Sequence, residues 1–322
     1  SSGDTRKSSS DQQIMHRKTD LVATFHRGSV HTRCTIVGSN DYNDYEEETM
    51  LGFIGAGAMG SAIIRGVIDS GLFTGEEIFV SEPNAAHAKK VAEDLGIQTA
   101  AGNVDLVNKV GKGGIVILAV KPHIVPLVLK EVREAAAEQG TVLVSIAAGT
   151  TLASMAENVA DGQPIVRIMP NVNAMIRQSM SALCPNEFVS DEQQATVSSI
   201  FEAVGLVEIM AEKDMAIYAA IAGCSPAYTF EYIDAMARAA VKNGLPKAQA
   251  VRIAAQAVLG SAATVLARAE DGLSPANLAD MVQSPGGTTV AGVVALEDAG
   301  FGRAVVRGVQ ASVDRDLEMQ GH

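Results

Sequence analysis

Residues 51–60 read Leu-Gly-Phe-Ile-Gly-Ala-Gly-Ala-Met-Gly, and this stretch decides the fold. An apolar strand over residues 51–55 runs directly into a predicted helix, which is the context that a Gly-x-Gly-x-x-Gly pattern requires. Gly55 permits the tight turn, Gly57 lets the backbone approach a pyrophosphate, and Gly60 lets the helix pack closely on the strand. The amides at the helix N-terminus favour phosphate, so we predict a dinucleotide site here. The alternative is a turn that merely needs small residues.

Short apolar runs alternate with helical patterns as far as about residue 212. The predicted strands after the first cover residues 77–81, 115–120, 141–146 and 165–169, and the predicted helices cover residues 58–70 and 84–95. Alternating strands and helices favour a parallel sheet covered on both faces. We therefore expect an α/β fold class, with an N-terminal Rossmann domain (a doubly wound, mostly parallel sheet) over residues 50–212.

Strand patterns stop after this point in the chain. Helical patterns cover residues 214–243, 246–269, 275–282 and 288–299, with Gly244, Gly272 and Gly300 as stops. The run over residues 250–267 is apolar on too many sides for a surface helix, so it must be buried, most simply against another subunit. We predict an all-α C-terminal domain over residues 213–322 that holds subunits together.

The composition narrows the function classes. The formal net charge of −12 repels phosphate backbones, so we expect no nucleic-acid partner. Cys34, Cys184 and Cys224 show no metal-ligand or redox spacing, and we predict no metal site and a reducing, cytoplasmic location. The longest uncharged stretches, 215–230 and 253–267, fall short of the roughly 20 residues that span a bilayer, so we expect no membrane partner.

Residues 1–49 differ from the rest of the chain. The first residues are small and polar, residues 41–48 are acidic, and no helical or strand period is sustained between them. We interpret this segment as an expression remnant or a flexible extension, with Met50 as a natural start. It is excluded from the fold prediction.

Two strand ends carry candidate cofactor residues. Ser81-Glu82 ends the second strand, 27 residues after Gly55, where an acidic residue binds a ribose hydroxyl in NAD sites. No Arg follows closely to receive a 2′-phosphate, and the alternative is an exposed turn carboxylate. Lys121 ends a strand at the carboxyl edge of the sheet, where ligands bind, or else simply faces solvent.

A second glycine turn, residues 284–289, reads Ser-Pro-Gly-Gly-Thr-Thr and precedes a predicted helix. Two consecutive glycines there expose several backbone amides, which can bind a carboxylate without any Arg. Thr288 and Thr289 place hydroxyls at its rim. The alternative is a plain helix start with Thr as the capping residue.

Together these motifs resemble those of pyrroline-5-carboxylate reductase, the last enzyme of proline synthesis. The resemblance runs from about Met50 to the end of the chain. The segments that carry it are residues 52–60, 118–123 (Leu-Ala-Val-Lys-Pro-His), 144–149 (Val-Ser-Ile-Ala-Ala-Gly), 167–171 (Arg-Ile-Met-Pro-Asn), 225–228 (Ser-Pro-Ala-Tyr), 244–246 (Gly-Leu-Pro), and 284–289 followed by Gly292.

The resemblance implies NADPH or NADH as cofactor and a homodimer formed by the C-terminal domain, which often assembles into a decamer. It implies that the cofactor residues are Ile54, Gly55, Ala56, Gly57, Ala58, Met59 and Gly60 at the pyrophosphate, Ser81, Glu82 and Asn103 at the adenosine ribose, and Ala119, Val120, Lys121, Pro122, Ile146, Ala147 and Ala148 at the nicotinamide half. The implied substrate residues are Ser284, Gly286, Gly287, Thr288 and Thr289.

The resemblance also implies the reaction. Hydride passes to the carbon of a cyclic imine that bears a carboxylate, and Thr289 is the expected catalytic residue at the ring nitrogen. Two positions depart from the family pattern, Val172-Asn173 in place of Thr-Pro and Cys224-Ser225 in place of Ser-Gly. The alternatives are a related imine or hydroxyacid reductase of the same architecture and a non-catalytic NAD(P)-binding regulator.

Overall fold

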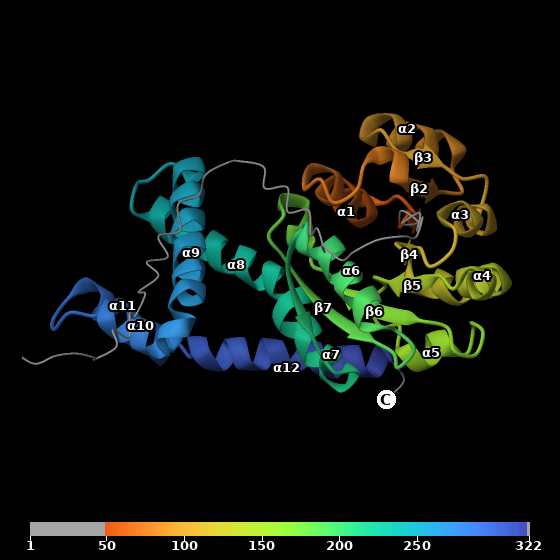
Figure 1. Cartoon of the computed structure of the whole chain (residues 1–322). Helices are drawn as coiled ribbons and strands as arrows, with labels where there is room; N and C mark the ends of the chain where they lie inside the picture. The colour runs from red at the N-terminus through yellow and green to blue at the C-terminus, as the bar shows by residue number, and fades with distance from the viewer. Residues whose placement is uncertain (1–48, 321–322) are drawn as a thin grey trace, which may run out of the picture. The chain divides into compact units, whose positions relative to one another are not determined.

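The structure is a computed structural model, and it describes residues 49–320. An eight-stranded sheet has helices α1 to α6 between its strands, and helices α7 to α12 follow it along the chain (Figure 1). The strands are β1 (Leu51–Ile54), β2 (Ile78–Ser81), β3 (Gln98–Thr99), β4 (Ile115–Leu118), β5 (Val142–Ser145), β6 (Ile165–Met169), β7 (Ser179–Pro185) and β8 (Gly205–Ile209).

The helices between the strands are mostly short. They are α1 (Ala58–Asp69), η1 (Gly75–Glu77), α2 (Ala85–Leu95), α3 (Asn103–Val110), η2 (Pro122–Ile124), α4 (Val125–Gln139), α5 (Leu152–Ala156), η3 (Val172–Ile176) and α6 (Asp191–Glu202). After β8 come η4 (Glu212–Asp214), α7 (Met215–Tyr218), the π-helix η5 (Ala219–Gly223), α8 (Ser225–Lys242), α9 (Lys247–Arg268), η6 (Ala269–Asp271), α10 (Pro275–Met281), α11 (Thr288–Asp298) and α12 (Phe301–Met319).

The sheet order is β3-β2-β1-β4-β5-β6-β7-β8. The first six strands in this order run parallel, which is the Rossmann strand order. β7 pairs with β6 in the antiparallel direction, and β8 runs parallel to β7. The predicted fold class, a mostly parallel Rossmann sheet followed by helices, is confirmed.

Alternate side chains of each strand feed two hydrophobic layers. Phe53 and Ile117 point into the layer covered by α1, α2 and α6, whereas Ile54 and Leu118 point into the layer covered by α3, α4 and α5. Because both faces are covered, the strand residues of β1, β2, β4 and β5 are all buried. This fixed sheet holds the strand ends, and therefore the loops after them, in place.

Three strands carry too weak a local pattern to be predicted from the sequence. β3 has only two residues, both exposed, and β7 interrupts its apolar residues with Ser179 and Ser181. β8 has Glu208 among its apolar residues. Pairing with a neighbouring strand, rather than the local sequence, makes these segments strands.

The helical part differs from the prediction in two places. The expected helix over residues 214–243 is divided into α7, a π-helical turn and α8, because Pro226 has no backbone amide and the Cys224 amide donates to the Ala219 carbonyl, 2.8 Å away. The helix α12, which follows Gly300, was not among the predicted helices.

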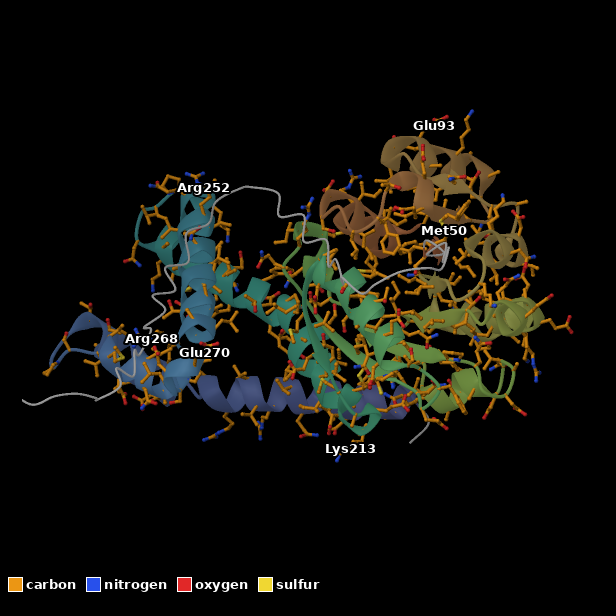
Figure 2. All side chains as sticks on the ribbon, viewed as in Figure 1. Met50, Glu93, Lys213, Arg252, Arg268 and Glu270 are labelled. Carbon is orange, nitrogen blue, oxygen red and sulfur yellow. The ribbon has the colours of Figure 1, made fainter. Side chains whose placement is uncertain are left out.

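Helix α9 exposes most of its apolar surface within the described part of the chain. Ile253, Leu259 and Leu266 are each more than half exposed. With η6 it forms a 25-residue helix of mean hydropathy 1.5 in its most apolar window, long enough by length and composition to cross a membrane. Figure 2 shows Arg252 near one end of α9, with Arg268 near the other. Such a helix needs another surface to cover it.

Candidate active site

The glycine loop, residues 54–60, sits at the carboxyl end of the central strand β1. The Gly55 amide donates to the Ser81 carbonyl at 2.8 Å, and the φ angle of Gly55 is +95°, a conformation that side chains disfavour. A Cβ at Gly55 would lie 2.6 Å from the Ala119 carbonyl oxygen. Only glycine therefore fits at the position where β1, β2 and β4 meet.

The other two glycines of the loop have different surroundings. Gly57 is the N-cap of α1, no side chain caps this helix, and a Cβ on Gly57 would meet nothing within 4 Å. At Gly60 a Cβ would lie 3.0 Å from the Gly55 carbonyl oxygen and 3.2 Å from the Ala119 Cβ. The loop thus offers open space and uncapped amides at Gly57 and close packing at Gly60, which suits a pyrophosphate.

Side chains at the end of β2 surround a cavity of about 940 Å³. Ser81, Glu82 and Asn103 all line it, as the ribose prediction requires. Glu82 Oε2 accepts a hydrogen bond of 3.2 Å from the Ala56 amide, and the Ser81 hydroxyl donates to Asn103 Oδ1 at 2.7 Å. This cavity therefore adjoins the glycine loop.

Glu131, which lines this cavity, and His87, which contacts the glycine loop, were missed by the sequence analysis. Glu131 on α4 accepts a hydrogen bond of 2.7 Å from Asn103 Nδ2, and His87 Nε2 lies 3.0 Å from the Ala56 carbonyl oxygen. Glu131 is 28 positions from Asn103 along the chain, and no local pattern links them. The packing of α4 beside α3 brings Glu131 to the site.

The predicted nicotinamide residues lie at the ends of β4 and β5. The Ala119 amide donates to the Ile54 carbonyl at 2.8 Å, and the Ile146 amide donates to the Leu118 carbonyl at 3.3 Å. These bonds bring the carboxyl ends of three strands together. Lys121 is exposed and occupies the N-cap position of η2, without a capping hydrogen bond from its side chain. The other predicted residues in the same two segments are Val120, Pro122, Ala147 and Ala148.

The second glycine turn opens helix α11. Gly286 has a φ angle of +70°, and the Gly287 amide donates to the Ser284 carbonyl at 3.0 Å. Gly287 is the N-cap, and no side chain caps the helix, so the alternative of a threonine cap is wrong. A Cβ at Gly287 would collide with Ser284 Oγ. The turn therefore offers free amides beside the exposed side chains of Thr288 and Thr289.

The second glycine turn stands apart from the first in the hydrogen bonding of residues 49–320. Among the described residues, no hydrogen bond joins the second glycine turn to residues 50–212. Ser284, Thr288 and Thr289 are exposed, whereas an anchored substrate would have to be enclosed.

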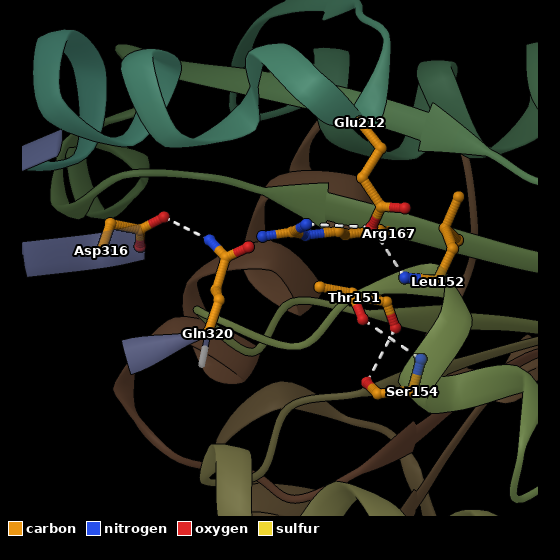
Figure 3. Close-up of polar contacts among 7 residues, drawn as sticks. All are labelled: Thr151, Leu152, Ser154, Arg167, Glu212, Asp316 and Gln320. Carbon is orange, nitrogen blue, oxygen red and sulfur yellow. Dashed lines mark hydrogen bonds and ion pairs between the residues drawn. The ribbon is translucent and has the colours of Figure 1, made fainter. Parts of the chain in front are cut away.

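An ion pair between a buried arginine and a partly exposed glutamate connects β6 with the first helical turn after the sheet. Arg167 is 3% exposed, and its guanidinium lies 3.0 Å from Glu212 Oε1, which also accepts a 2.7 Å hydrogen bond from the Leu152 amide (Figure 3). Figure 3 shows Gln320, the C-cap residue of α12, beside the guanidinium, donating to Asp316. The pair therefore ties β6, α5 and η4 together next to the end of α12.

A second buried network holds the π-helix against the sheet. Asn171 Nδ2 donates to the Ala222 carbonyl at 3.0 Å. The Tyr218 hydroxyl lies 2.7 Å from the Met180 carbonyl oxygen and 3.0 Å from that of Met169. Burial raises the pKa of Tyr218 above its ordinary value of 10.0, so the hydroxyl stays protonated and can donate.

The two departures from the family pattern lie next to this network. Asn171 Oδ1 accepts a 3.1 Å hydrogen bond from the Asn173 amide and so caps η3, while Val172 is 45% exposed. Cys224 is half-buried and lies at the junction of the π-helix and α8. That the small-for-small change at Cys224-Ser225 is tolerated, and that Val172-Asn173 affects the surroundings of the nicotinamide, both stay predictions.

The fold and the glycine loop together define a class of protein. A Rossmann sheet with an uncapped, glycine-lined helix start at the end of β1 and an acidic residue at the end of β2 is the site of a dinucleotide cofactor. The chain is a dinucleotide-binding protein of the Rossmann class.

Comparison with known proteins identifies the family. Residues 212–319 match the family model described as pyrroline-5-carboxylate reductase dimerisation, and residues 50–149 match NADP oxidoreductase coenzyme F420-dependent. A pyrroline-5-carboxylate reductase of Escherichia coli is 40% identical over 272 residues, covering 84% of this chain and 98% of the relative. One from Methanosarcina acetivorans is 36% identical over 273 residues, covering 85% and 98%. The chain belongs to the pyrroline-5-carboxylate reductase family, as its motifs suggested.

Solved structures agree with this assignment. The 1-pyrroline-5-carboxylate reductase of Streptococcus pyogenes has a TM-score of 0.72 and 38% identity, covering 83% of this chain and 97% of that one. A pyrroline carboxylate reductase of Plasmodium falciparum, solved with NADP bound, has a TM-score of 0.72 and 29% identity, covering 85% and 99%. An oxidoreductase that uses NAD(P)H is therefore established by fold, motif and relatives together.

Proposed function

We propose that this chain reduces the cyclic imine (S)-1-pyrroline-5-carboxylate to L-proline, the last step of proline biosynthesis. The second glycine turn is the observation that carries the proposal. It combines an uncapped helix start with two exposed threonines, so it can bind a carboxylate and also reach a neighbouring ring nitrogen. A protein that only bound NAD(P)H would have no use for this turn.

The cofactor residues divide along the carboxyl edge of the sheet. Residues 54–60 hold the pyrophosphate, Ser81, Glu82 and Asn103 hold the adenosine ribose, and residues 119–122 and 146–148 border the nicotinamide. The open space at Gly57 and the cavity of about 940 Å³ beyond β2 support this assignment. When bound, the cofactor supplies a hydride to the imine carbon.

The substrate carboxylate binds at the second glycine turn. Ser284, Gly286, Gly287 and Thr288 surround the N-terminus of α11, where free amides and the partial positive charge of the helix favour an anion. Anchoring the carboxylate there orients the ring and selects which face receives the hydride. Such positioning can contribute several kcal/mol to catalysis.

Thr289 is the proposed catalytic residue. Reduction of a C=N bond adds a hydride to carbon and a proton to nitrogen, and the protonated imine is the better hydride acceptor. The Thr289 hydroxyl is exposed on the first turn of α11, next to the proposed carboxylate site. Its role is to hydrogen-bond the ring nitrogen, which orients it and assists its protonation.

A complete active site requires two subunits. The second glycine turn is exposed and has no hydrogen bond to residues 50–212 among the described residues, so another subunit brings it to the nicotinamide. The exposed apolar surface of α9 lies within the residues that match the dimerisation family, so a second subunit would cover it. We assign residues 213–322 to a homodimer-forming domain, after a Rossmann domain over residues 50–212, and infer a decamer from further association of dimers.

Burial against a second subunit accounts for the apolar surface of α9, and no membrane is needed to cover it. A helix that is apolar enough for a bilayer is equally suited to the interface of an obligate dimer. We propose a cytoplasmic enzyme with no membrane or nucleic-acid partner. Residues 1–48 lie outside the described residues, so the interpretation of residues 1–49 as a remnant or flexible extension stays a prediction.

A direct assay tests the function. Loss of NADH or NADPH absorbance is followed with pyrroline-5-carboxylate as substrate, and product is identified as proline. A hydroxyacid substrate serves as the control for a related reductase. Tight NAD(P)H binding without oxidation by pyrroline-5-carboxylate would refute the proposal and leave a binding protein.

A further inference from the structure

Two side-chain donors that line the cavity beside β2, on Ser81 and Asn103, are already bonded to acceptors that line the same cavity. The Ser81 hydroxyl donates to Asn103 Oδ1 at 2.7 Å, and Asn103 Nδ2 donates to Glu131 Oε2 at 2.7 Å. Glu82 accepts from the Ala56 amide at 3.2 Å and from the Asn84 amide at 3.4 Å. The chain of bonds from Ser81 through Asn103 thus ends on the Glu131 carboxylate, and the Glu82 carboxylate accepts its bonds separately.

The charges lining the cavity are mainly negative. Glu82, Glu93 and Glu131 line it, with Lys89 as the one cationic lining residue among those described. Lys89 and Glu93 lie on α2, with Glu93 labelled in Figure 2, and they pair with each other at 3.8 Å. Beyond the lining, Lys109 donates to the Thr99 carbonyl and pairs with a carboxylate of its own helix, Asp105.

These surroundings distinguish between the two cofactors. A free ribose hydroxyl brings a hydrogen and needs an acceptor, which Glu82 provides next to the glycine loop. A 2′-phosphate offers only acceptor oxygens and about two negative charges, so it needs donors and cations. Among the described lining residues, Lys89 on α2 is the one cation, and it pairs with Glu93, whereas Glu82 and Glu131 would repel the phosphate.

We propose that Glu82 and Glu131 make this reductase selective for NADH over NADPH. Glu82 binds the ribose hydroxyls, and Glu131 holds the amide of Asn103 away from the position of a 2′-phosphate. The inference rests on the proposed assignment of this cavity to the adenosine ribose, and it adds Glu131 as a residue that determines cofactor specificity.

The experiment compares dissociation constants of the full-length enzyme for NADH and NADPH, measured by nicotinamide fluorescence. NADPH is expected to bind at least about tenfold more weakly than NADH. Glu131→Gln retains an acceptor for Asn103 and removes the charge, so it should reduce this ratio several-fold, and Glu82→Gln with Glu131→Gln should bring it close to one. Raising the ionic strength should also reduce the wild-type ratio, because both carboxylates border solvent.

Glu134→Gln is the matched control, since it removes one charge from α4 at a position that does not line the cavity. It should leave the ratio unchanged. Equal or tighter wild-type binding of NADPH would overturn the proposal, as would an unchanged ratio in the double variant. Turnover with pyrroline-5-carboxylate at saturating concentrations of each cofactor separates the two failures. Turnover with a preference for NADPH would support the proposed function and refute this inference. Absence of turnover with either cofactor would refute the proposed function, and the ratio of dissociation constants would still test this inference.

Discussion

Two variants that are each impaired as reductases should regain activity when one subunit of each forms a mixed dimer. The first is Gly57→Asp. The φ angle of Gly57 is −68° and no atom lies within 4 Å of an added Cβ, so the substitution leaves the fold intact. Its carboxylate would occupy and repel the pyrophosphate position. The second is Thr289→Ala, which leaves the Rossmann sheet untouched and removes the proposed partner of the ring nitrogen.

The arrangement of the two glycine-rich sites sets the expected magnitude. If the turn of one subunit serves the cofactor site of the other, a mixed dimer contains one site with both defects and one with none. Random pairing of equal amounts makes about half of the dimers mixed, so about a quarter of the wild-type sites are intact. If each chain completed its own site, a mixed dimer would contain no intact site.

The assay is the rate of NAD(P)H oxidation after the two variants are unfolded and refolded together in equal amounts. Each variant refolded alone gives the background, and wild-type protein refolded in the same way gives the reference rate. A mixture no more active than the average of its separately refolded parents would refute the two-subunit site.

Three further outcomes are expected from single positions. Thr289→Ala alone should lower kcat by about a hundredfold with little change in NAD(P)H affinity, and Thr289→Ser should recover much of the loss; an unaltered kcat would remove Thr289 from the mechanism. In urea unfolding at fixed protein concentration, Glu212→Ala should cost about 3–5 kcal/mol by leaving the buried Arg167 charge unpaired. Arg167→Met should cost less, since the Glu212 side chain is 31% exposed, and the reverse order would contradict this account. The folded-state pKa of Tyr218 lies above its ordinary value of 10.0, so stability should be intact below pH 10 and fall above it, by up to about 1.4 kcal/mol per pH unit. Tyr218→Phe should remove that slope, and an identical slope in the variant would assign it to other groups.

Much of the fold could be predicted from local pattern because its central strands are short, apolar and bounded by turn residues. β6 was predicted at its observed limits, and Asn84 and Gly96 end α2 as expected. The last two strands could not be predicted this way, since β7 and β8 owe their conformation to neighbours across the sheet. The division between α7 and α8 was also not predicted, although Pro226 in the sequence could have indicated it.

The candidate site also has parts that local sequence patterns predict and parts that they do not. Its two glycine turns can be recognised in the sequence, because the positive φ angles at Gly55 and Gly286 are disfavoured for residues with a side chain. The residues that act through side chains from distant elements do not. Glu131 reaches Asn103, and Arg167 reaches Glu212, across 28 and 45 positions of chain.

The sequence by itself determined a Rossmann sheet, a dinucleotide loop and a glycine turn that opens a helix, because each depends on a few adjacent residues whose backbone geometry permits little else. Only the tertiary structure showed that the loop and the turn have no hydrogen bond between them among the described residues and that the turn is exposed. It also showed that the donors beside β2 end on carboxylates. These two findings depend on which elements pack together although they are distant in the sequence. Burial and pairing across the fold determine this packing, and local sequence patterns do not reveal it.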